Sequence, residues 1–557
     1  MNPTYDVSFE KTRDNLTTVK VNGYYLHSKF KPSLEGAKLA EEAYQPHHLH
    51  IIFGYGMGYL VDSLLDKRIY NEPIIVIDPL IDNGTLKIKD YTNQNVYVFK
   101  TKEIEEIRNN IGLLAGMTNK MTFIVSPNYK KIFLTEVHEI ANLVKEAQER
   151  ELVNIHTMNH FAVDWQINYA MNLKKMVQDH SLNELAQKYN CPIVVASSGP
   201  SLTKQLPLLK MYRNRFILIC AGSTINSLLD ADIIPNYVVS IDGGINNFRH
   251  FENLSLKNIE LIYSPILHYK VRESFKENAF LFIPHSRPQF EKNLNDKVNR
   301  NFPIMSGGGS VAHFALSIAK FITTGPICLI GQDLAYTNNQ THSAGNKNNE
   351  VASEVSKVMV EGYYGEKVCS SKIFKGMINT FEDLNMAQPH SNKVFNCTEG
   401  GAKVNGYSQI SFKQFLESYA TSEVERISLD KLEKYKTETI LENEFKLYDE
   451  ILKLLNKGLR VIKNENGVLF SKKGIAKIGE IESNLNKLYE KSCMDILLEP
   501  IITSAEHRFL PSPNESKYDE FKRVKEYITV LYTESIEMIE KYIERLNEIL
   551  KEESEEK

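Results

Sequence analysis

The stretch from Ser197 to Ser201, with the sequence SSGPS, ends a short β-branched run and precedes an apparently helical segment. Gly199 can adopt a positive φ and carries no side chain that would keep a ligand away from the main chain. Pro200 and Ser201 suit the first turn of a helix, where unpaired amides and the positive end of the dipole attract anions. With the hydroxyl of Ser198, the pattern favours a phosphate site. It matches neither the P-loop nor the G-x-G-x-x-G motif, and a plain strand-to-helix turn would look the same.

Small and polar residues also follow two neighbouring strand-like runs. Gly222 and Ser223 end RFILICAGS, and Asp242 and Gly243 end YVVSIDGG. Open α/β sheets bind their ligands beyond the carboxyl ends of the strands, so these residues are candidate nucleotide or sugar contacts. Asp242 could bind a sugar hydroxyl, a base edge or a metal, or it could cap a helix.

A glycine run opens a later helical stretch. Ser306, Gly307 and Gly308 precede VAHFALSIAK. Such a run permits close approach of an anion to the main chain, and it also occurs in plain flexible loops.

The strand PICLIGQDL ends in a group that could carry the reaction. Gln332 and Asp333 close the strand, and Tyr336 and His342 follow it. A phenol can donate a hydrogen bond to a departing phosphate, and a neutral imidazole can accept a proton near pH 7.

Other histidines compete with His342 for the role of base. His268 and His285 both follow strand-like runs, whereas His313 lies inside an apolar helical stretch and is expected to pack in the core. Arg287 could pair with a sugar carboxylate.

A second glycine-rich turn lies near the N-terminus. Gly54, Gly56 and Gly58 follow a strand-like run, and Asp78 stands about 24 residues after Gly54. This spacing fits a Rossmann nucleotide site, for example one for S-adenosylmethionine. A degenerate fold that contacts the acceptor or another partner is the interpretation that we favour.

These candidates require a parallel sheet to position them. CPIVVA, RFILICAG, YVVSIDGG, IELIYSP, AFLFIP and PICLIGQDL are near-continuous apolar runs alternating with helical stretches, which indicates a doubly wound α/β fold. VMVEGYYGEKVCSS suggests a hairpin and VFNCTEGGAKVNG a loop. We expect three domains: a smaller α/β domain at 1–155, a central Rossmann-like domain at 156–410, and a helical bundle at 411–557.

Composition narrows the class of protein. The 557 residues carry a formal net charge of −4, so no global basic field favours nucleic acid. No apolar run is long enough to span a bilayer and no secretory signal is recognisable, which predicts a cytoplasmic protein. The six cysteines include no Cys-x-x-Cys pair and indicate buried thiols rather than a zinc site or a disulfide framework.

Several motifs, taken in order, resemble those of the Maf (motility-associated factor) family of bacterial flagellin glycosyltransferases. They are SSGPSL, RFILICAGSTINSLLDADIIPNYVVSIDGG, SGGGSVAHFALSIAK, LIGQDLAYTNNQTHSAG and FNCTEGGAKVNG. The central domain is also similar to bacterial sialyltransferases with a modified GT-A, Rossmann-like fold. The resemblance covers residues 160–410 and extends to the N-terminal glycine turn followed by VIDP.

The resemblance implies a function. A nonulosonic acid of the pseudaminic or legionaminic type would pass from its CMP-activated form to Ser or Thr of flagellin, with inversion and without a metal or further cofactor. By the same resemblance, the Gly199–Ser201 turn contacts the nucleotide, Asp333 and Tyr336 form the strand-end motif, and His342 is the base. The helical bundle would dock on the core, bind flagellin or mediate self-association, so a homo-oligomer is possible.

One departure and two alternatives stay open. The sialyltransferase pattern has a second phosphate-binding tyrosine, for which only Tyr363 or Tyr364 could substitute here. The central domain also resembles archaeal pterin pyrophosphokinases, which use ATP and Mg²⁺. A noncatalytic flagellin-binding chaperone is the third hypothesis.

Overall fold

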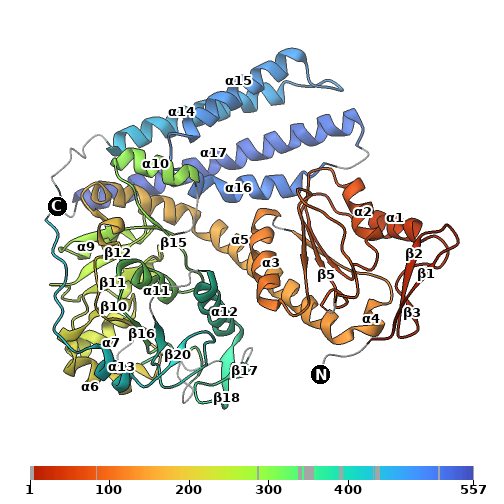
Figure 1. Ribbon diagram of the computed structural model, residues 1–557. Helices are drawn as coiled ribbons and strands as arrows, with labels where there is room; N and C mark the ends of the chain where they lie inside the picture. Colours follow the sequence, from red (N-terminus) through yellow and green to blue (C-terminus); the bar gives the residue numbers. More distant parts are fainter. Residues whose placement is uncertain are drawn as a thin grey trace. The chain divides into compact units, whose positions relative to one another are not determined.

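The computed structural model describes residues 5–82, 84–118, 120–284, 288–336, 342–343, 357–387, 393–430, 432, 440–511 and 515–555. The chain divides into two compact units. Unit 1 comprises Met1–His160 and Ser504–Tyr527, and unit 2 comprises Phe161–Thr503 and Ile528–Lys557. Figure 1 shows the elements of both units, coloured along the sequence.

Unit 1 contains two sheets. The antiparallel sheet has the order β1-β2-β3, and the parallel sheet has the order β6-β5-β4-β7. The strands are β1 (Val7–Lys11), β2 (Thr17–Val21), β3 (Tyr24–Tyr25), β4 (Leu49–Phe53), β5 (Ile74–Ile77), β6 (Val96–Phe99) and β7 (Met121–Val125). The helices are α1 (Pro32–Ala43), α2 (Tyr59–Lys67), α3 (Ile104–Thr118), α4 (Tyr129–Ile132) and the first part of α5 (Leu134–Met176).

Unit 2 is built on a nine-stranded parallel sheet with the order β20-β19-β16-β9-β10-β11-β12-β13-β8. Its strands are β8 (His180–Ser181), β9 (Ile193–Ala196), β10 (Ile217–Ala221), β11 (Tyr237–Ser240), β12 (Glu260–Tyr263), β13 (Ala279–Leu281), β16 (Ile327–Ile330), β19 (Val394–Asn396) and β20 (Ser408–Gln409). Two further pairs are parallel β14 (Ile283–Pro284) with β15 (Ile304–Met305), and the hairpin of β17 (Lys357–Glu361) with β18 (Lys367–Ser371).

The helices of unit 2 follow the strands and then form the C-terminal region. They are α6 (Leu202–Met211), α7 (Thr224–Asp230), α8 (Ile245–Arg249), α9 (Tyr269–Ser274), α10 (Pro288–Val298), α11 (Val311–Ile322), α12 (Lys372–Ala387), α13 (Phe412–Tyr419), α14 (Ile440–Lys463) and α15 (Lys472–Tyr489). Two others, α16 (Asp495–Arg508) and α17 (Lys517–Glu555), each have residues in both units. Helices α14 and α15 pack side by side (Figure 1). None of the described helices combines the length and the apolar content that a bilayer crossing requires.

The strands of the large sheet form because both of their faces are buried. In β9, Val194 and Ala196 belong to one hydrophobic core, and Ile193 and Val195 belong to the other. Burial on both sides explains why the strands are near-continuous apolar runs instead of alternating ones. The α/β fold expected from the sequence is confirmed, as are the VMVEGYYGEKVCSS hairpin and the helical C-terminal region.

One local expectation is wrong. VFNCTEGGAKVNG is not entirely a loop, because Val394–Asn396 form β19 and pair with β16. A three-residue strand is too short for its pattern to be recognised, and its pairing with β16 decides its structure.

The strand order identifies a switch point. From β9 the chain proceeds outward through β10, β11, β12 and β13, and it then returns to the other side of β9 to form β16 and β19. The connections that follow β9 and β16 diverge, and we call the edge of the sheet at the carboxyl ends of these two strands the crevice. This is the place where open α/β sheets bind their ligands.

Candidate functional site

Two turns meet at the switch point, one after β9 and one after β16. The Gly199 N–H donates to the Gly331 carbonyl at 2.8 Å, and the Ser197 hydroxyl donates to Gln332 Oε1 at 2.6 Å. A Cβ on Gly199 would lie 2.1 Å from an Asp333 carboxylate oxygen and 2.5 Å from the Gly331 carbonyl oxygen. Glycine is therefore required at 199, because the two turns pack too closely for any side chain.

Asp333 holds the first turn in place. Its carboxylate, in a residue only 2% exposed, accepts hydrogen bonds from the Ser201 N–H at 3.2 Å and the Ser201 hydroxyl at 2.6 Å. Its carbonyl accepts the Ala402 N–H at 2.7 Å, and a Cβ on Gly401 would lie 2.1 Å from that carbonyl oxygen. Asp333 is therefore a positioning residue, and the polar groups of Ser201 are already engaged inside the protein. Ser198 and Pro200 remain half-buried at the crevice.

Gln205 and Thr398 extend this network, and the sequence analysis did not single them out. Gln205 Oε1 accepts the Gly331 N–H at 3.1 Å, and its amide group donates to the Thr398 carbonyl at 3.2 Å. The Thr398 hydroxyl accepts the Gln332 N–H at 3.3 Å. Gln205 stands four residues after Ser201, one helical turn along α6, and this spacing is the signal that could have indicated it.

Tyr336 follows Asp333 on a segment held by the β17–β18 hairpin. The Tyr336 N–H donates to the Cys369 carbonyl at 2.8 Å, and the Ser370 hydroxyl donates to the Leu334 carbonyl at 2.7 Å. Leu334 has a φ of 50°, a conformation that costs free energy for a residue with a side chain. The half-buried Tyr336 ring packs against Phe374, with ring centroids 5.7 Å apart.

His342 is placed through its neighbour Ser343. The Ser343 N–H donates to the Ser198 carbonyl at 2.7 Å, and its hydroxyl lies 2.9 Å from the hydroxyl of Ser227 on α7. These contacts bring the main chain of the half-buried His342 to the ends of β9 and β10. Thr337–Thr341 and Ala344–Ser356 lie outside the described residues.

The two substitutes for a second phosphate-binding tyrosine differ. The buried Tyr363 hydroxyl lies within hydrogen-bonding distance of the Asn396 and Ile410 carbonyls, at 3.0 and 3.1 Å, so it is engaged in the fold. Tyr364 is 70% exposed, and its hydroxyl donates to the Glu399 carbonyl at 3.3 Å.

The residues after β10 and β11 lie along the same edge of the sheet. Gly222 is buried and donates its N–H to the Val239 carbonyl at 3.0 Å, and half-buried Ser223 directly precedes α7. Gly243 is buried, whereas the side chain of Asp242 is exposed. The protein around Asp242 nevertheless removes enough hydration to raise the pKa of its carboxyl.

The 306–308 turn precedes α11 and is packed tightly. A Cβ on Gly307 would lie 2.6 Å from the Phe314 ring, and one on Gly308 would lie 2.8 Å from the Thr380 methyl group. Ser306 is exposed. His313 is fully buried, as expected, and its Nδ1 lies 3.0 Å from the Gly308 carbonyl oxygen. The glycines of this run therefore serve packing.

Of the two competing histidines, His268 and His285, the structure describes His268. His268 is 9% exposed and lies between the rings of Phe248 and Tyr269, at centroid distances of 5.6 and 5.2 Å. Burial lowers its pKa to about 4, so it is neutral at pH 7. His285 and Arg287 lie outside the described residues.

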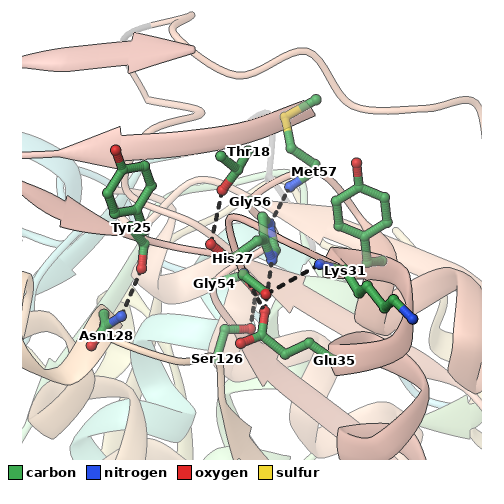
Figure 2. Close-up of polar contacts among 12 residues, drawn as sticks. Thr18, Tyr25, His27, Lys31, Glu35, Gly54, Gly56, Met57, Ser126 and Asn128 are labelled. Carbon is green, nitrogen blue, oxygen red and sulfur yellow. Dashed lines mark hydrogen bonds and ion pairs between the residues drawn. The ribbon is translucent and has the colours of Figure 1, made fainter. Parts of the chain in front are cut away.

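The N-terminal glycine turn in unit 1 is filled by the protein's own side chains. The Tyr55 and Gly56 N–H groups donate to Asp78 at 2.7 and 3.1 Å. The Met57 N–H donates to His27 Nε2 at 2.8 Å (Figure 2). Asp78 is fully buried and also accepts the Tyr129 hydroxyl, and burial raises the pKa of its carboxyl.

This arrangement differs from that of a Rossmann nucleotide site. There, amides of the turn contact the pyrophosphate and the acidic residue reaches the ribose. Here His27 and Asp78 use three of those amides, and Asp78 has no surface with which to meet a ribose. His27 is the residue that the sequence analysis missed, since it stands about 30 residues before its partner Met57 and in no motif.

No group of three or more His, Cys, Asp or Glu side chains that could hold a metal ion occurs among the described residues.

Comparison with known proteins finds a matching family model and similar solved structures. A family model described as 6-hydroxymethylpterin diphosphokinase MptE-like matches residues 167–339, a range that contains both turns of the crevice. The solved structure of the MAf glycosyltransferase from Magnetospirillum magneticum AMB-1 is similar with a TM-score of 0.56 and 14% sequence identity, covering 98% of this chain and 93% of that chain. No curated protein sequence matches. The chain therefore has the fold of a Maf glycosyltransferase, as the sequence motifs predicted.

Proposed function

We propose that the protein is an inverting, metal-independent glycosyltransferase that moves a nonulosonic acid from its CMP-activated form to Ser or Thr of flagellin. The observation that carries the proposal is the pair of glycine turns packed at the switch point of a sheet that shares the fold of a Maf glycosyltransferase. The donor, of the pseudaminic or legionaminic type, and the flagellin acceptor come from the motif resemblance.

The crevice suits a departing phosphate. Breaking the bond between the anomeric carbon and CMP places negative charge on the phosphate and positive charge on the sugar. Helix α6 begins at Leu202, directly after the Gly199–Ser201 turn, so its positive dipole end lies at this edge of the sheet, where the Asp333 carboxylate already accepts the Ser201 N–H. The half-buried hydroxyls of Ser198 and Tyr336 are the donors that we assign to the phosphate, while Asp333 keeps the turn in shape.

The attacking hydroxyl must also lose its proton. The motif resemblance gives this role to His342, whose neighbour Ser343 is bonded to the same turn. His342 therefore belongs to the site that we propose, at the side where the phosphate would lie.

We assign no nucleotide to unit 1. His27 and Asp78 fill its glycine turn, so contact with the acceptor or with another partner protein is the role that we propose for this unit. Self-association of the protein would be a further role for the C-terminal helices.

Purified protein, flagellin and a CMP-nonulosonic acid test the proposal. We expect CMP release above spontaneous hydrolysis, a mass gain of one sugar on flagellin, and a product of inverted anomeric configuration. Absence of both CMP release and mass gain with pseudaminic and legionaminic donors would refute the proposed function.

A second candidate function has its own observation. The family model that matches residues 167–339 is named for a pterin diphosphokinase, so the same crevice could bind ATP with Mg²⁺. Thermal shift separates the two, because a ligand stabilises the protein to which it binds. Stabilisation by CMP and not by ATP with Mg²⁺ favours the transferase, and the opposite result favours the kinase.

A further inference from the structure

Of the two acidic residues at the candidate site, Asp242 is the one whose side chain the fold leaves exposed. Its side chain is exposed, and within the described part of the chain its carboxylate makes no hydrogen bond or ion pair. Asp333, by contrast, is buried and bonded to Ser201. Asp333 is therefore engaged in positioning the turn, whereas the side chain of Asp242 is exposed to solvent.

The main chain beneath Asp242 is fixed from several sides. The Asp242 carbonyl accepts the Asn247 side-chain amide at 2.8 Å and the His268 N–H at 3.3 Å. The next carbonyl, of Gly243, accepts the side-chain amide of Asn168 on α5 at 2.9 Å. A carboxylate on such a supported backbone is preorganised for a ligand, because little freedom remains to be lost on binding.

Gly243 shows how closely this turn is packed. A Cβ at 243 would lie 2.6 Å from the Trp165 ring, 2.7 Å from the Ile266 carbonyl oxygen and 2.8 Å from the Asn168 amide. Trp165 is the only tryptophan of the chain, and its half-buried ring stacks on Phe161 with centroids 5.9 Å apart. The Trp165 ring therefore packs directly against the residue that follows Asp242.

Nearby charge does not neutralise Asp242. His268, whose main chain is bonded to it, is buried and neutral at pH 7, and its Nδ1 has no hydrogen-bond partner. Incomplete hydration raises the pKa of the Asp242 carboxyl, which makes the carboxylate a better proton acceptor than a fully solvated one.

The position of Asp242 fits an in-line displacement. Two strand spacings separate the β9 and β11 ends, which amounts to about 10 Å. In the transition state, two bonds join the phosphorus to the anomeric carbon through the bridging oxygen. The acceptor oxygen lies about 3 Å beyond that carbon, and the base lies a hydrogen bond of about 3 Å beyond the acceptor oxygen. Phosphorus and base are therefore roughly 8–9 Å apart. A phosphate at the Gly199 turn thus leaves Asp242 at about the distance that a base opposite the leaving group requires.

The contacts of Ser343 with Ser198 and Ser227 place the main chain of His342 at the ends of β9 and β10, closer to the Gly199 turn than the end of β11 is. Ser198 is one residue from Gly199, so the main chain of His342 is close to the leaving phosphate. A base must stand opposite the leaving group in an inverting displacement, and this requirement favours Asp242.

We propose that Asp242, and not His342, is the catalytic base that takes the proton from the acceptor hydroxyl. As the acceptor oxygen bonds to the anomeric carbon, its proton passes to the Asp242 carboxylate. The bond from that carbon to the phosphate oxygen breaks, and CMP leaves with the electron pair. The inference rests on the proposed function and changes only the role that the motif resemblance gives to His342.

The variant Asp242→Asn tests the proposal, with azide as a second acceptor. Azide is already an anion and needs no base. We expect hydroxyl transfer to fall by about 10²- to 10⁴-fold. Transfer to azide, and stabilisation by CMP, should stay within about threefold of the wild type, because the donor site is intact.

The control is Asp232→Asn, the same change at a residue whose side chain is 87% exposed and paired only at the surface with Lys210. It should leave hydroxyl transfer unchanged. Undiminished hydroxyl transfer by Asp242→Asn would overturn the inference, and so would an equal loss of azide and hydroxyl transfer, which would assign Asp242 to donor binding. A wild-type protein that transfers to neither acceptor would instead refute the proposed function itself.

Discussion

Replacing Asp333 by Asn should destabilise unit 2 more than it alters any contact with substrate. The carboxylate accepts two groups of Ser201, the N–H at 3.2 Å and the hydroxyl at 2.6 Å, in a residue only 2% exposed. Hydrogen bonds to a buried charged acceptor contribute about 1.5–3 kcal/mol each, and an amide can replace only one of the two bonds. We therefore expect a loss of about 3 kcal/mol.

Calorimetric melting is the assay. For a unit of this length, which spans Phe161–Thr503 and Ile528–Lys557, such a loss lowers the melting temperature by about 4 °C. The matched control is Asp242→Asn, whose carboxylate has no partner among the described residues and should cost no more than about 0.5 kcal/mol.

A double-mutant cycle with Ser201→Ala should show a coupling of at least about 1 kcal/mol with Asp333→Asn. If Asp333→Asn had the melting temperature of the wild type and lost only activity, Asp333 would face the substrate. The positioning role assigned to it would then be wrong.

Two further predictions concern the packed turns. Burial holds the pKa of His27 at about 4, below its value of about 6.5 in the unfolded chain. The unfolded state therefore binds the extra proton as pH falls from 6.5 to 4, and unfolding free energy is lost across that window, by up to about 3 kcal/mol. The variant His27→Gln keeps an acceptor for the Met57 N–H but does not titrate in this range. Denaturant unfolding at pH 7 and at pH 4 should show that the wild type loses about 3 kcal/mol more unfolding free energy between the two pH values than the variant does. Equal losses in the two proteins would contradict the role given to His27. Gly243→Ala should cost about 1–3 kcal/mol and change the fluorescence of Trp165, because its Cβ meets that ring at 2.6 Å. Gly244→Ala meets nothing within 4 Å and should do neither; matching results for the two variants would refute the packing argument.

The strands and the candidate turns could be predicted from the sequence because their signals are local. CPIVVA and PICLIGQDL are apolar along their whole length, since both faces of β9 and β16 are buried. Their adjacency, and hence the switch point, depends on pairing between residues about 130 positions apart, which periodicity does not encode.

The roles of the two aspartates could not be predicted. Both follow apolar strands in similar glycine-containing turns, and only the fold shows that Ser201 engages Asp333 while Asp242 has no such partner in the described residues. The same limit applied to unit 1, where GYGMG and Asp78 have Rossmann spacing but His27, from a distant segment, occupies the turn.

A crystal structure with CMP tests the central claim most directly, which is that the switch point holds the nucleotide of a sugar donor. We expect the phosphate beside the β9 and β16 turns, beyond the carboxyl ends of these strands and within about 3 Å of the Ser198 or Tyr336 hydroxyl. The Asp242 carboxylate should then lie roughly 8–9 Å from the phosphorus. CMP bound elsewhere, at the Gly54–Gly58 turn for example, or a crevice that takes up ATP with Mg²⁺ and not CMP, would contradict the account.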